Sequence, residues 1–281
     1  MIGRRGRVVL AAAVATALGL AGCGGGSGGT AASGSSGGGQ ALKIGIKFDQ
    51  PGLGLKQGDT YTGLDVDVAT YVAKKLGTDP ARISWVQAPS AQRETLLSTG
   101  QVDLVVATYS ITDARKQKVS FAGPYFIAGQ DLLVRSDDTT ITGPESLQNK
   151  KLCSVKGSTS AQKVKSKYPG VQLQEFGTYS ECVAALVARG VDALTTDDTI
   201  LAGYAAQPQY KGKLKVVGKP FSQERYGIGL KKGDTALCRK VTDAITSMVA
   251  DGSWQKAVDA NLGAAQYKPG AGNPPTTDPC S

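Results

Sequence analysis

The chain has 281 residues, 41% of them hydrophobic and 20% charged, a composition typical of one or two globular domains. It contains no histidine, which excludes a Ser-His-Asp triad, a Cys-His pair and a His-ligated zinc site. The formal net charge is +9, or +6 (29 basic against 23 acidic residues) without the three arginines of an N-terminal segment that we expect to be removed. A surplus this small and dispersed does not predict nucleic-acid binding.

The N-terminal 40 residues have the pattern of an export signal followed by a tether. Basic residues precede the apolar run Val8–Ala21, which at about 1.5 Å per residue is too short to cross a hydrocarbon core of roughly 30 Å. The run ends in Leu-Ala-Gly-Cys23, which resembles a bacterial lipobox. We therefore expect residues 1–22 to be cleaved and Cys23 to carry a lipid. The Gly/Ser-rich remainder of residues 23–40 predicts a flexible linker.

Predicted strands and helices alternate from Ala41 onward. A first series comprises strand 43–47, helix 64–76, strand 83–86, helix 93–98 and strand 103–107. A second series comprises strand 152–155, helix 161–167, strand 171–176, helix 180–188 and strand 192–195. The chain then continues with strand 226–230, helices 236–250 and 253–262, and an irregular Pro-rich tail over residues 269–281. Two such series predict an α/β fold of two lobes, with ligands binding beyond the carboxyl ends of strands.

We assign residues 41–130 and 223–268 to lobe 1 and residues 131–222 to lobe 2, with chain crossings near 129–135 and 219–225. Four cysteines remain after Cys23, an even number that suits disulfides in an exported chain. Three pairings are possible. We favour Cys153 with Cys182 and Cys238 with Cys280 because each pair lies within one lobe, but the spacing leaves the connectivity open.

Polar groups follow three predicted strand ends. Ser110 and Arg115 come after strand 103–107, where a hydroxyl and a guanidinium suit a carboxylate. The turn Lys156–Ser160 opens a helix and offers N–H groups to an anion, or is an ordinary N-cap. Asp197 can pair with an ammonium, whereas Asp198 is a candidate helix cap. The alternative interpretation of Arg115 is that it forms an ion pair on the protein surface. Together the three ends complement a free α-amino acid.

Several blocks of the sequence resemble the family 3 periplasmic amino-acid-binding proteins. They are the run from Asp103 to Lys116, the run from Val119 to Phe126, the segment Tyr61–Val68, and the segments 156–160 and 195–198, in the family's order. The resemblance implies a periplasmic-binding-protein fold, in which two lobes joined by two crossover hinge strands close over the ligand as a Venus flytrap. It also implies solute capture for an ABC importer.

The resemblance also assigns roles to individual residues. By position, Ser110, Arg115 and the carbonyl of Thr108 would hold the amino acid from lobe 1. From lobe 2, Thr159 and Ser160 would meet its α-carboxylate and Asp197 its ammonium.

Two further cations bear on the ligand's side chain. Lys47 lies in the first loop and Arg93 begins the predicted helix 93–98, so both would repel a cationic side chain and attract an anionic one. The opening of the first loop, from Lys47 to Gly54, resembles the glutamate-binding lipoproteins of actinobacterial importers. We therefore expect glutamate, with aspartate and glutamine as alternatives. The competing interpretation places Lys47 in solvent and pairs Arg93 with Glu94 or Asp103.

The sequence thus predicts a monomeric, lipid-anchored binding protein on the extracytoplasmic face of the cell membrane. It would deliver its ligand to ABC permease subunits, and it would use no cofactor, no metal and no nucleic acid. The chain has no Gly-x-x-x-x-Gly-Lys-Ser/Thr phosphate loop, so ATP hydrolysis belongs to another chain. We do not expect an enzyme. The alternatives are a ligand-sensing domain and an exported lyase for a small carboxylate on the same fold.

Overall fold

The computed structural model describes residues 41–280. The expected signal peptide, the lipidation site Cys23 and the Gly/Ser linker lie outside these residues. Among residues 41–280, no helix combines the length and the apolar character that crossing a bilayer requires.

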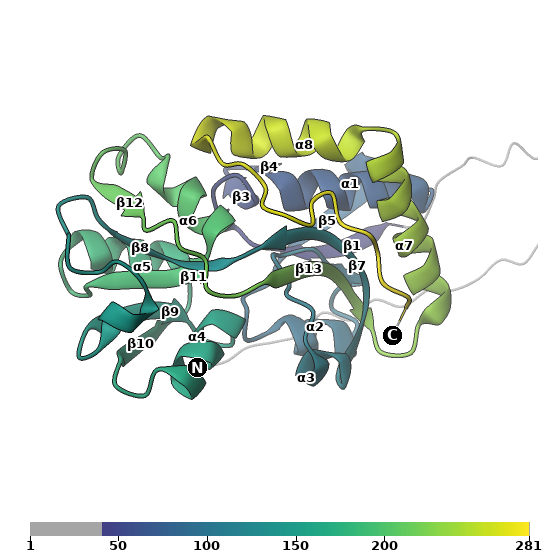
Figure 1. Ribbon diagram of the computed structural model, residues 1–281. Coiled ribbons are helices and arrows are strands. Elements are labelled where there is room, and N and C mark those ends of the chain that lie inside the picture. The colour runs from purple at the N-terminus through teal and green to yellow at the C-terminus, as the bar shows by residue number, and fades with distance from the viewer. Residues whose placement is uncertain (1–40, 281) are drawn as a thin grey trace, which may run out of the picture. The chain divides into compact units, whose positions relative to one another are not determined.

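The first sheet has five strands in the order β5-β1-β6-β13-β7 (Figure 1). The strand β1 pairs in parallel with β5 and β6, while β13 runs antiparallel to β6 and β7. The bounds are β1 (Leu42–Ile46), β5 (Ile83–Gln87), β6 (Leu104–Val105), β7 (Val119–Ala128) and β13 (Glu224–Lys231). The observed strand β6 covers only two residues of the predicted strand 103–107, and the chain turns shortly after it at Thr108, which has a φ of 45°.

Helix α1 (Leu64–Lys75) follows its sequence pattern closely. Leu64, Val68 and Val72 are fully buried at helical spacing, and Gly77, with a φ of 83°, follows the helix end as predicted. The other helices of this lobe are α2 (Arg93–Ser98), α3 (Asp113–Lys116), α7 (Thr235–Ala250) and α8 (Ser253–Leu262). The observed bounds of α2 and α8 equal the predicted ones.

The second sheet also has five strands, in the order β10-β9-β11-β8-β12. Its bounds are β8 (Gln130–Arg135), β9 (Lys151–Val155), β10 (Gln172–Phe176), β11 (Ala193–Asp197) and β12 (Leu214–Val216). The helices of this lobe are α4 (Thr159–Lys167), α5 (Tyr179–Val187) and α6 (Asp198–Ala205). Of these elements, sequence patterns had not predicted β8, β12 or the extent of α6.

The chain passes between the two sheets twice. It leaves the first sheet at the end of β7 and enters the second at β8, with only Gly129 between them. It returns between β12 and β13. The two-lobed α/β fold with two crossings is therefore present, while the lobe ranges 41–130, 131–222 and 223–268 stay predictions.

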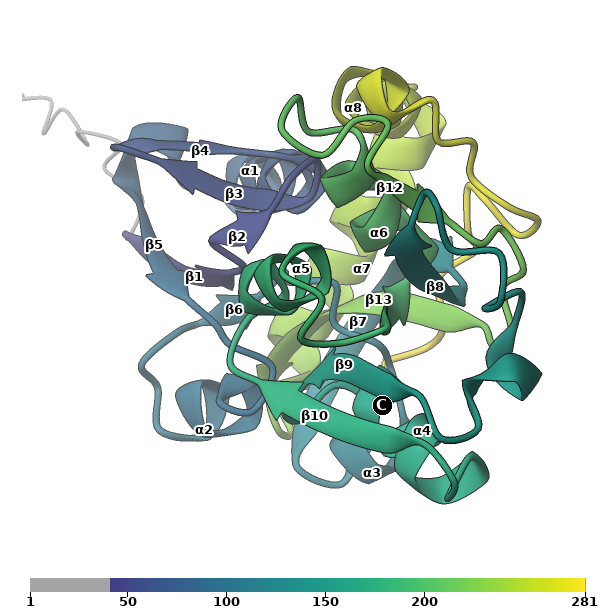
Figure 2. The same cartoon turned by 90° about the vertical axis from the view of Figure 1, so that its left-hand side faces the viewer.

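A third, small sheet was not anticipated from the sequence. It is a meander of β2 (Asp49–Gln50), β3 (Gly54–Gln57) and β4 (Thr60–Thr62) beside α1 (Figure 2). Single 3₁₀ turns occur at η1 (Pro80–Arg82), η2 (Pro144–Leu147) and η3 (Gly263–Ala265). The meander carries the loop that follows β1 toward the second lobe, where β2 contacts α5 and α6.

Both favoured disulfides are present. Cys153 in β9 bonds to Cys182 in α5, and Cys238 in α7 bonds to Cys280 in the C-terminal tail. The first bond fixes a helix to a strand within lobe 2. The second attaches the irregular tail to lobe 1, as expected.

Candidate functional site

The turn after β6 presents the first group of polar atoms. The Thr108 N–H donates to Asp65 Oδ2 at 3.0 Å, and the Thr108 hydroxyl donates to Gln50 Oε1 at 3.2 Å. These bonds hold the turn in its left-handed conformation. Ser110 next forms an isolated bridge to Tyr226 in β13, and its hydroxyl lies 3.4 Å from the Thr159 hydroxyl of lobe 2.

Arg115 is buried in the four-residue helix α3, although the competing interpretation placed it on the surface. Its Nη1 donates to the Ser110 carbonyl at 2.8 Å, and its Nη2 donates to the Gly157 carbonyl of lobe 2 at 3.1 Å. Glu94 pairs with its Nε at 3.4 Å. The guanidinium also lies 4.9 Å from the centroid of the Tyr109 ring. It is therefore held in one orientation facing the second lobe.

Lys47 and Arg93 converge on one hydroxyl, Ser90 Oγ. Lys47 Nζ donates to it at 3.0 Å and Arg93 Nη2 also donates to it, while both side chains are only 3% exposed. Neither forms an ion pair with a carboxylate in residues 41–280, so the pairing of Arg93 with Glu94 or Asp103 is absent. Burial, helped by the charge of Arg93, lowers the pKa of Lys47 to about 7.

The turn between β9 and α4 supplies the second group. The Ser158 hydroxyl accepts from the Ala161 N–H at 3.0 Å and so caps α4. Thr159 and Ser160 follow at the positive end of the helix dipole. Ser160 Oγ is buried and has no hydrogen-bond partner within the described chain. The turn is thus both an N-cap and a possible anion site.

Asp197 stands at the junction of β11 and α6. Its Oδ2 accepts from the Tyr226 hydroxyl at 2.7 Å, while its Oδ1 is buried without a hydrogen-bond partner among residues 41–280. Burial, followed by the negative charge of Glu224, raises the pKa of Asp197 well above its usual range. Asp198 instead accepts from the Gly129 and Thr199 N–H groups, so it stabilises the first crossing and the start of α6.

These groups surround one small cavity between the lobes. Seven of the eight predicted ligand-binding residues line its walls, and Lys47 is the exception: Arg93, Thr108, Ser110, Arg115, Thr159, Ser160 and Asp197. Three further residues line it: Ser158, which belongs to the predicted turn 156–160, and Tyr179 and Ile200, which sequence reasoning did not select. Lys47 reaches the cavity wall indirectly, through the Ser90 hydroxyl that it shares with Arg93. Ser110 Oγ and Thr159 Oγ1 meet across the cavity at 3.4 Å.

The cavity is very small, with a volume of about 10 Å³, which is room for about one water molecule. Pockets for drug-sized ligands occupy about 300–1,000 Å³, so an amino acid fits between these walls only when the lobes lie further apart than they do here. A larger hollow, lined partly by α6 and residues 264–268, lies apart from these groups. The small cavity is the better candidate because it combines buried cations from lobe 1 with an acidic side chain and a helix N-terminus from lobe 2.

For Tyr179, which sequence reasoning missed, the sequence did contain a local signal. Thr178 and Glu181 form a capping box, whose Thr-x-x-Glu pattern marks the start of a helix. Tyr179 therefore had to lie at a helix N-terminus close to a strand end. Only the tertiary structure places its side chain in the cavity wall.

Two α/β lobes, joined by two crossings and enclosing a small polar cavity, define a two-lobed solute-binding protein. The chain belongs to the bacterial extracellular solute-binding proteins, family 3, whose model matches residues 42–264.

Proteins of known sequence and structure agree with this assignment. The glutamate-binding protein GluB of Corynebacterium glutamicum is 51% identical over 234 residues, covering 79% of this chain and 79% of GluB. The ABC transporter glutamine-binding protein GlnH of Bacillus subtilis is 37% identical over 218 residues, covering 76% of this chain and 78% of GlnH. An ancestral arginine-binding protein, solved bound to glutamine, superposes with a TM-score of 0.73 at 34% identity, covering 79% of this chain and 97% of that protein.

Proposed function

We propose that this protein captures glutamate between its two lobes. The observation that supports this proposal most directly is a buried pair of cations, Lys47 and Arg93. Both donate to the Ser90 hydroxyl, and neither has a carboxylate partner within the described residues. An unpaired buried charge is costly, and an anionic ligand would offset that cost. The side-chain carboxylate of glutamate supplies this anion, whereas glutamine supplies only a neutral amide.

The remaining wall groups fit the α-amino and α-carboxylate groups of the same ligand. Arg115 and the N-terminus of α4, with Thr159 and Ser160, offer N–H and hydroxyl donors to the α-carboxylate. The unpartnered Oδ1 of Asp197 accepts from the ammonium. An ammonium beside Asp197 also stabilises its carboxylate, which counteracts the desolvation that raises its pKa. Ser110 and the Thr108 carbonyl complete the lobe 1 side.

The relatives support an amino acid ligand and leave its identity to experiment. The relative with 51% identity is named for glutamate and the one with 37% identity for glutamine. Aspartate would reach Lys47 and Arg93 less well because its side chain is one methylene shorter. We therefore place glutamate first, with glutamine and aspartate as alternatives.

In this proposal the ligand stabilises the closed arrangement of the lobes by contacting both. The closed monomer would then be recognised by the permease subunits of an ABC importer. Lipidation of Cys23 would hold it at the extracytoplasmic face of the membrane, on the linker of residues 23–40. The protein binds without turnover, since the acidic groups around the cavity serve binding or capping contacts.

Calorimetric titration with glutamate, aspartate, glutamine and arginine tests the proposal. Saturable one-to-one binding with glutamate tightest is expected. Tighter binding of glutamine or arginine would refute the role given to Lys47 and Arg93. Chemical conversion of any of the four ligands during incubation would favour the enzyme alternative. If deleting the gene for this protein left amino-acid uptake by the cell unchanged, the sensor alternative would be favoured.

A further inference from the structure

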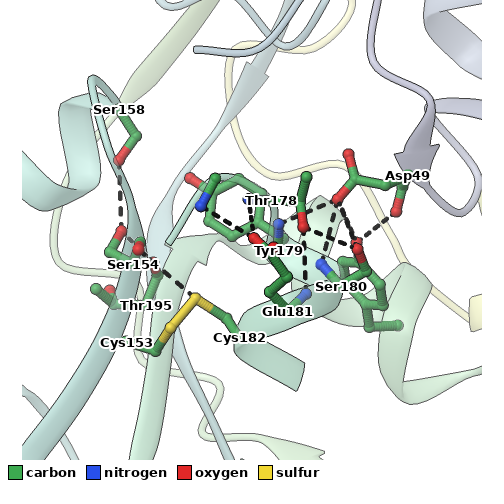
Figure 3. Close-up of a disulfide and its surroundings, with 12 residues drawn as sticks. Asp49, Cys153, Ser154, Ser158, Thr178, Tyr179, Ser180, Glu181, Cys182 and Thr195 are labelled. Carbon is green, nitrogen blue, oxygen red and sulfur yellow. Dashed lines mark hydrogen bonds between the residues drawn. A yellow bond between two sulfur atoms is a disulfide. The ribbon is translucent and has the colours of Figure 1, made fainter. Parts of the chain in front are cut away.

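Asp49 of lobe 1 lies against the N-terminus of α5 in lobe 2 (Figure 3). Its Oδ2 accepts from the Tyr179 N–H at 3.0 Å and from the Ser180 N–H at 3.2 Å. The Tyr204 hydroxyl of α6 donates to the same oxygen at 3.1 Å and also to the Asp49 carbonyl. One carboxylate thus connects the small meander of lobe 1 to two helices of lobe 2.

The N-terminus of α5 needs this carboxylate to satisfy its first turn. The capping box satisfies two N–H groups inside lobe 2, because Thr178 Oγ1 accepts from the Glu181 N–H and Glu181 Oε2 accepts from the Thr178 N–H. The N–H groups of Tyr179 and Ser180 lie between them and bond to Asp49 across the lobe boundary. A negative charge at this end is also favoured by the helix dipole.

A second close approach lies beside the first. Gly203 of α6 faces Pro51, two residues after Asp49, and a Cβ added at Gly203 would overlap the Pro51 carbonyl oxygen. The three nearest atoms to that added Cβ all belong to Pro51. A methyl group at position 203 therefore conflicts with lobe 1 alone, and lobe 2 accommodates it.

These contacts connect directly to the cavity. Tyr179 donates its N–H to Asp49 and its side chain lines the cavity wall. The disulfide between Cys153 and Cys182 fixes α5 to β9, the strand that leads into the cavity turn at Ser158 (Figure 3). Movement of α5 against lobe 1 is thereby coupled to the position of that turn.

We infer that Asp49, Pro51 and Gly203 form a closure latch that sets the affinity for the ligand without touching it. When the lobes separate, the hydrogen bonds between Asp49 and the two N–H groups of α5 break, and each group bonds to water instead. Pro51 then moves away from Gly203. The latch contributes to every ligand that closes the protein, so it raises affinity without discriminating between side chains. The inference rests on the proposed function only for the choice of glutamate as the first probe.

Two variants test the latch from opposite sides. Asp49→Asn removes the charge, and because hydrogen bonds to charged groups are the stronger class we expect the Kd for glutamate to rise about tenfold or more. Gly203→Ala should raise the Kd at least as much, yet leave the melting temperature of the ligand-free protein equal or higher, because alanine favours a helix. A defect in folding would lower that melting temperature instead.

Each latch variant has a matched control: one removes a carboxylate from the same meander as Asp49, and the other replaces a glycine that, like Gly203, has a helical backbone. Asp59→Asn removes an exposed carboxylate at the turn between β3 and β4, and Gly263→Ala adds a methyl group at a helical φ with no neighbour within 4 Å. Both controls should bind glutamate as the wild type does. The Kd for glutamine should rise in the two latch variants by the same factor as that for glutamate.

Amide hydrogen exchange at Tyr179 and Ser180 tests the latch in the closed protein, saturated with glutamate or with whichever of aspartate, glutamine and arginine it binds. Exchange at these two positions should be faster in Asp49→Asn than in the wild type or in Asp59→Asn. If the wild type binds another of these amino acids and no glutamate, the proposed ligand is wrong, yet faster exchange with that amino acid bound still supports the latch. Unchanged exchange, or unchanged affinity in both latch variants, overturns it.

Discussion

Lys47→Met removes the charge that we assign to recognition of the ligand's side chain. Lys47 is 3% exposed, and its Nζ bonds to Ser90 Oγ at 3.0 Å. A hydrogen bond to a charged group contributes about 1.5–3 kcal/mol, so glutamate affinity should fall roughly 10- to 150-fold. Glutamine, which offers no charge, should lose only about 2- to 12-fold, the value of an ordinary hydrogen bond of about 0.5–1.5 kcal/mol. Methionine keeps much of the buried volume, so the ligand-free protein should stay folded.

The pH dependence gives a second measurement of the same group. Burial lowers the pKa of Lys47 to about 7 without ligand, and a bound carboxylate raises it again. Binding of glutamate above pH 7 therefore takes up a proton, and its affinity should fall as pH rises, by up to about tenfold per pH unit. Below pH 7 the lysine is already charged, so the slope disappears there.

Calorimetry in buffers of different ionisation enthalpy measures this proton uptake directly. At pH 8 the wild type should take up a proton with glutamate, and Lys47→Met should not. The contribution of Lys47 should be absent when glutamine binds to the wild type. Equal losses for glutamate and glutamine in Lys47→Met, or the same proton uptake in both proteins, would refute the reasoning.

Three further predictions concern the rest of the site and the tail. Arg115→Ala should abolish detectable binding of glutamate and glutamine alike while circular dichroism stays native; near-normal affinity would contradict its role. Asp197→Asn should weaken both ligands, and in the wild type affinity should fall as pH decreases through the raised pKa of Asp197, because an ammonium needs the carboxylate. Replacing Cys238 and Cys280 with serine should lower the free energy of unfolding by about 4 kcal/mol, the loop-entropy value for a separation of 42 residues, as measured in urea; an unchanged midpoint would show that the tail contributes little.

Local sequence patterns were sufficient for elements that bury one continuous face. Helix α8 has Trp254, Val258 and Leu262 buried at helical spacing, and its predicted bounds were correct. The meander β2-β3-β4 was missed because its strands have two to four residues and are defined only by pairing with each other. No periodicity can develop over so few positions.

The sequence by itself determined the fold class, the family, the two alternating series of strands and helices, and most of the residues around the cavity. Motifs suffice there because strand ends and helix N-termini carry their polar groups in local sequence. Only the tertiary structure decided that Lys47 and Arg93 share Ser90, that Tyr179 reaches the cavity, and that Asp49 caps a helix of the other lobe. These contacts join residues that are distant in sequence, and burial and pairing across lobes depend on how the two sheets pack.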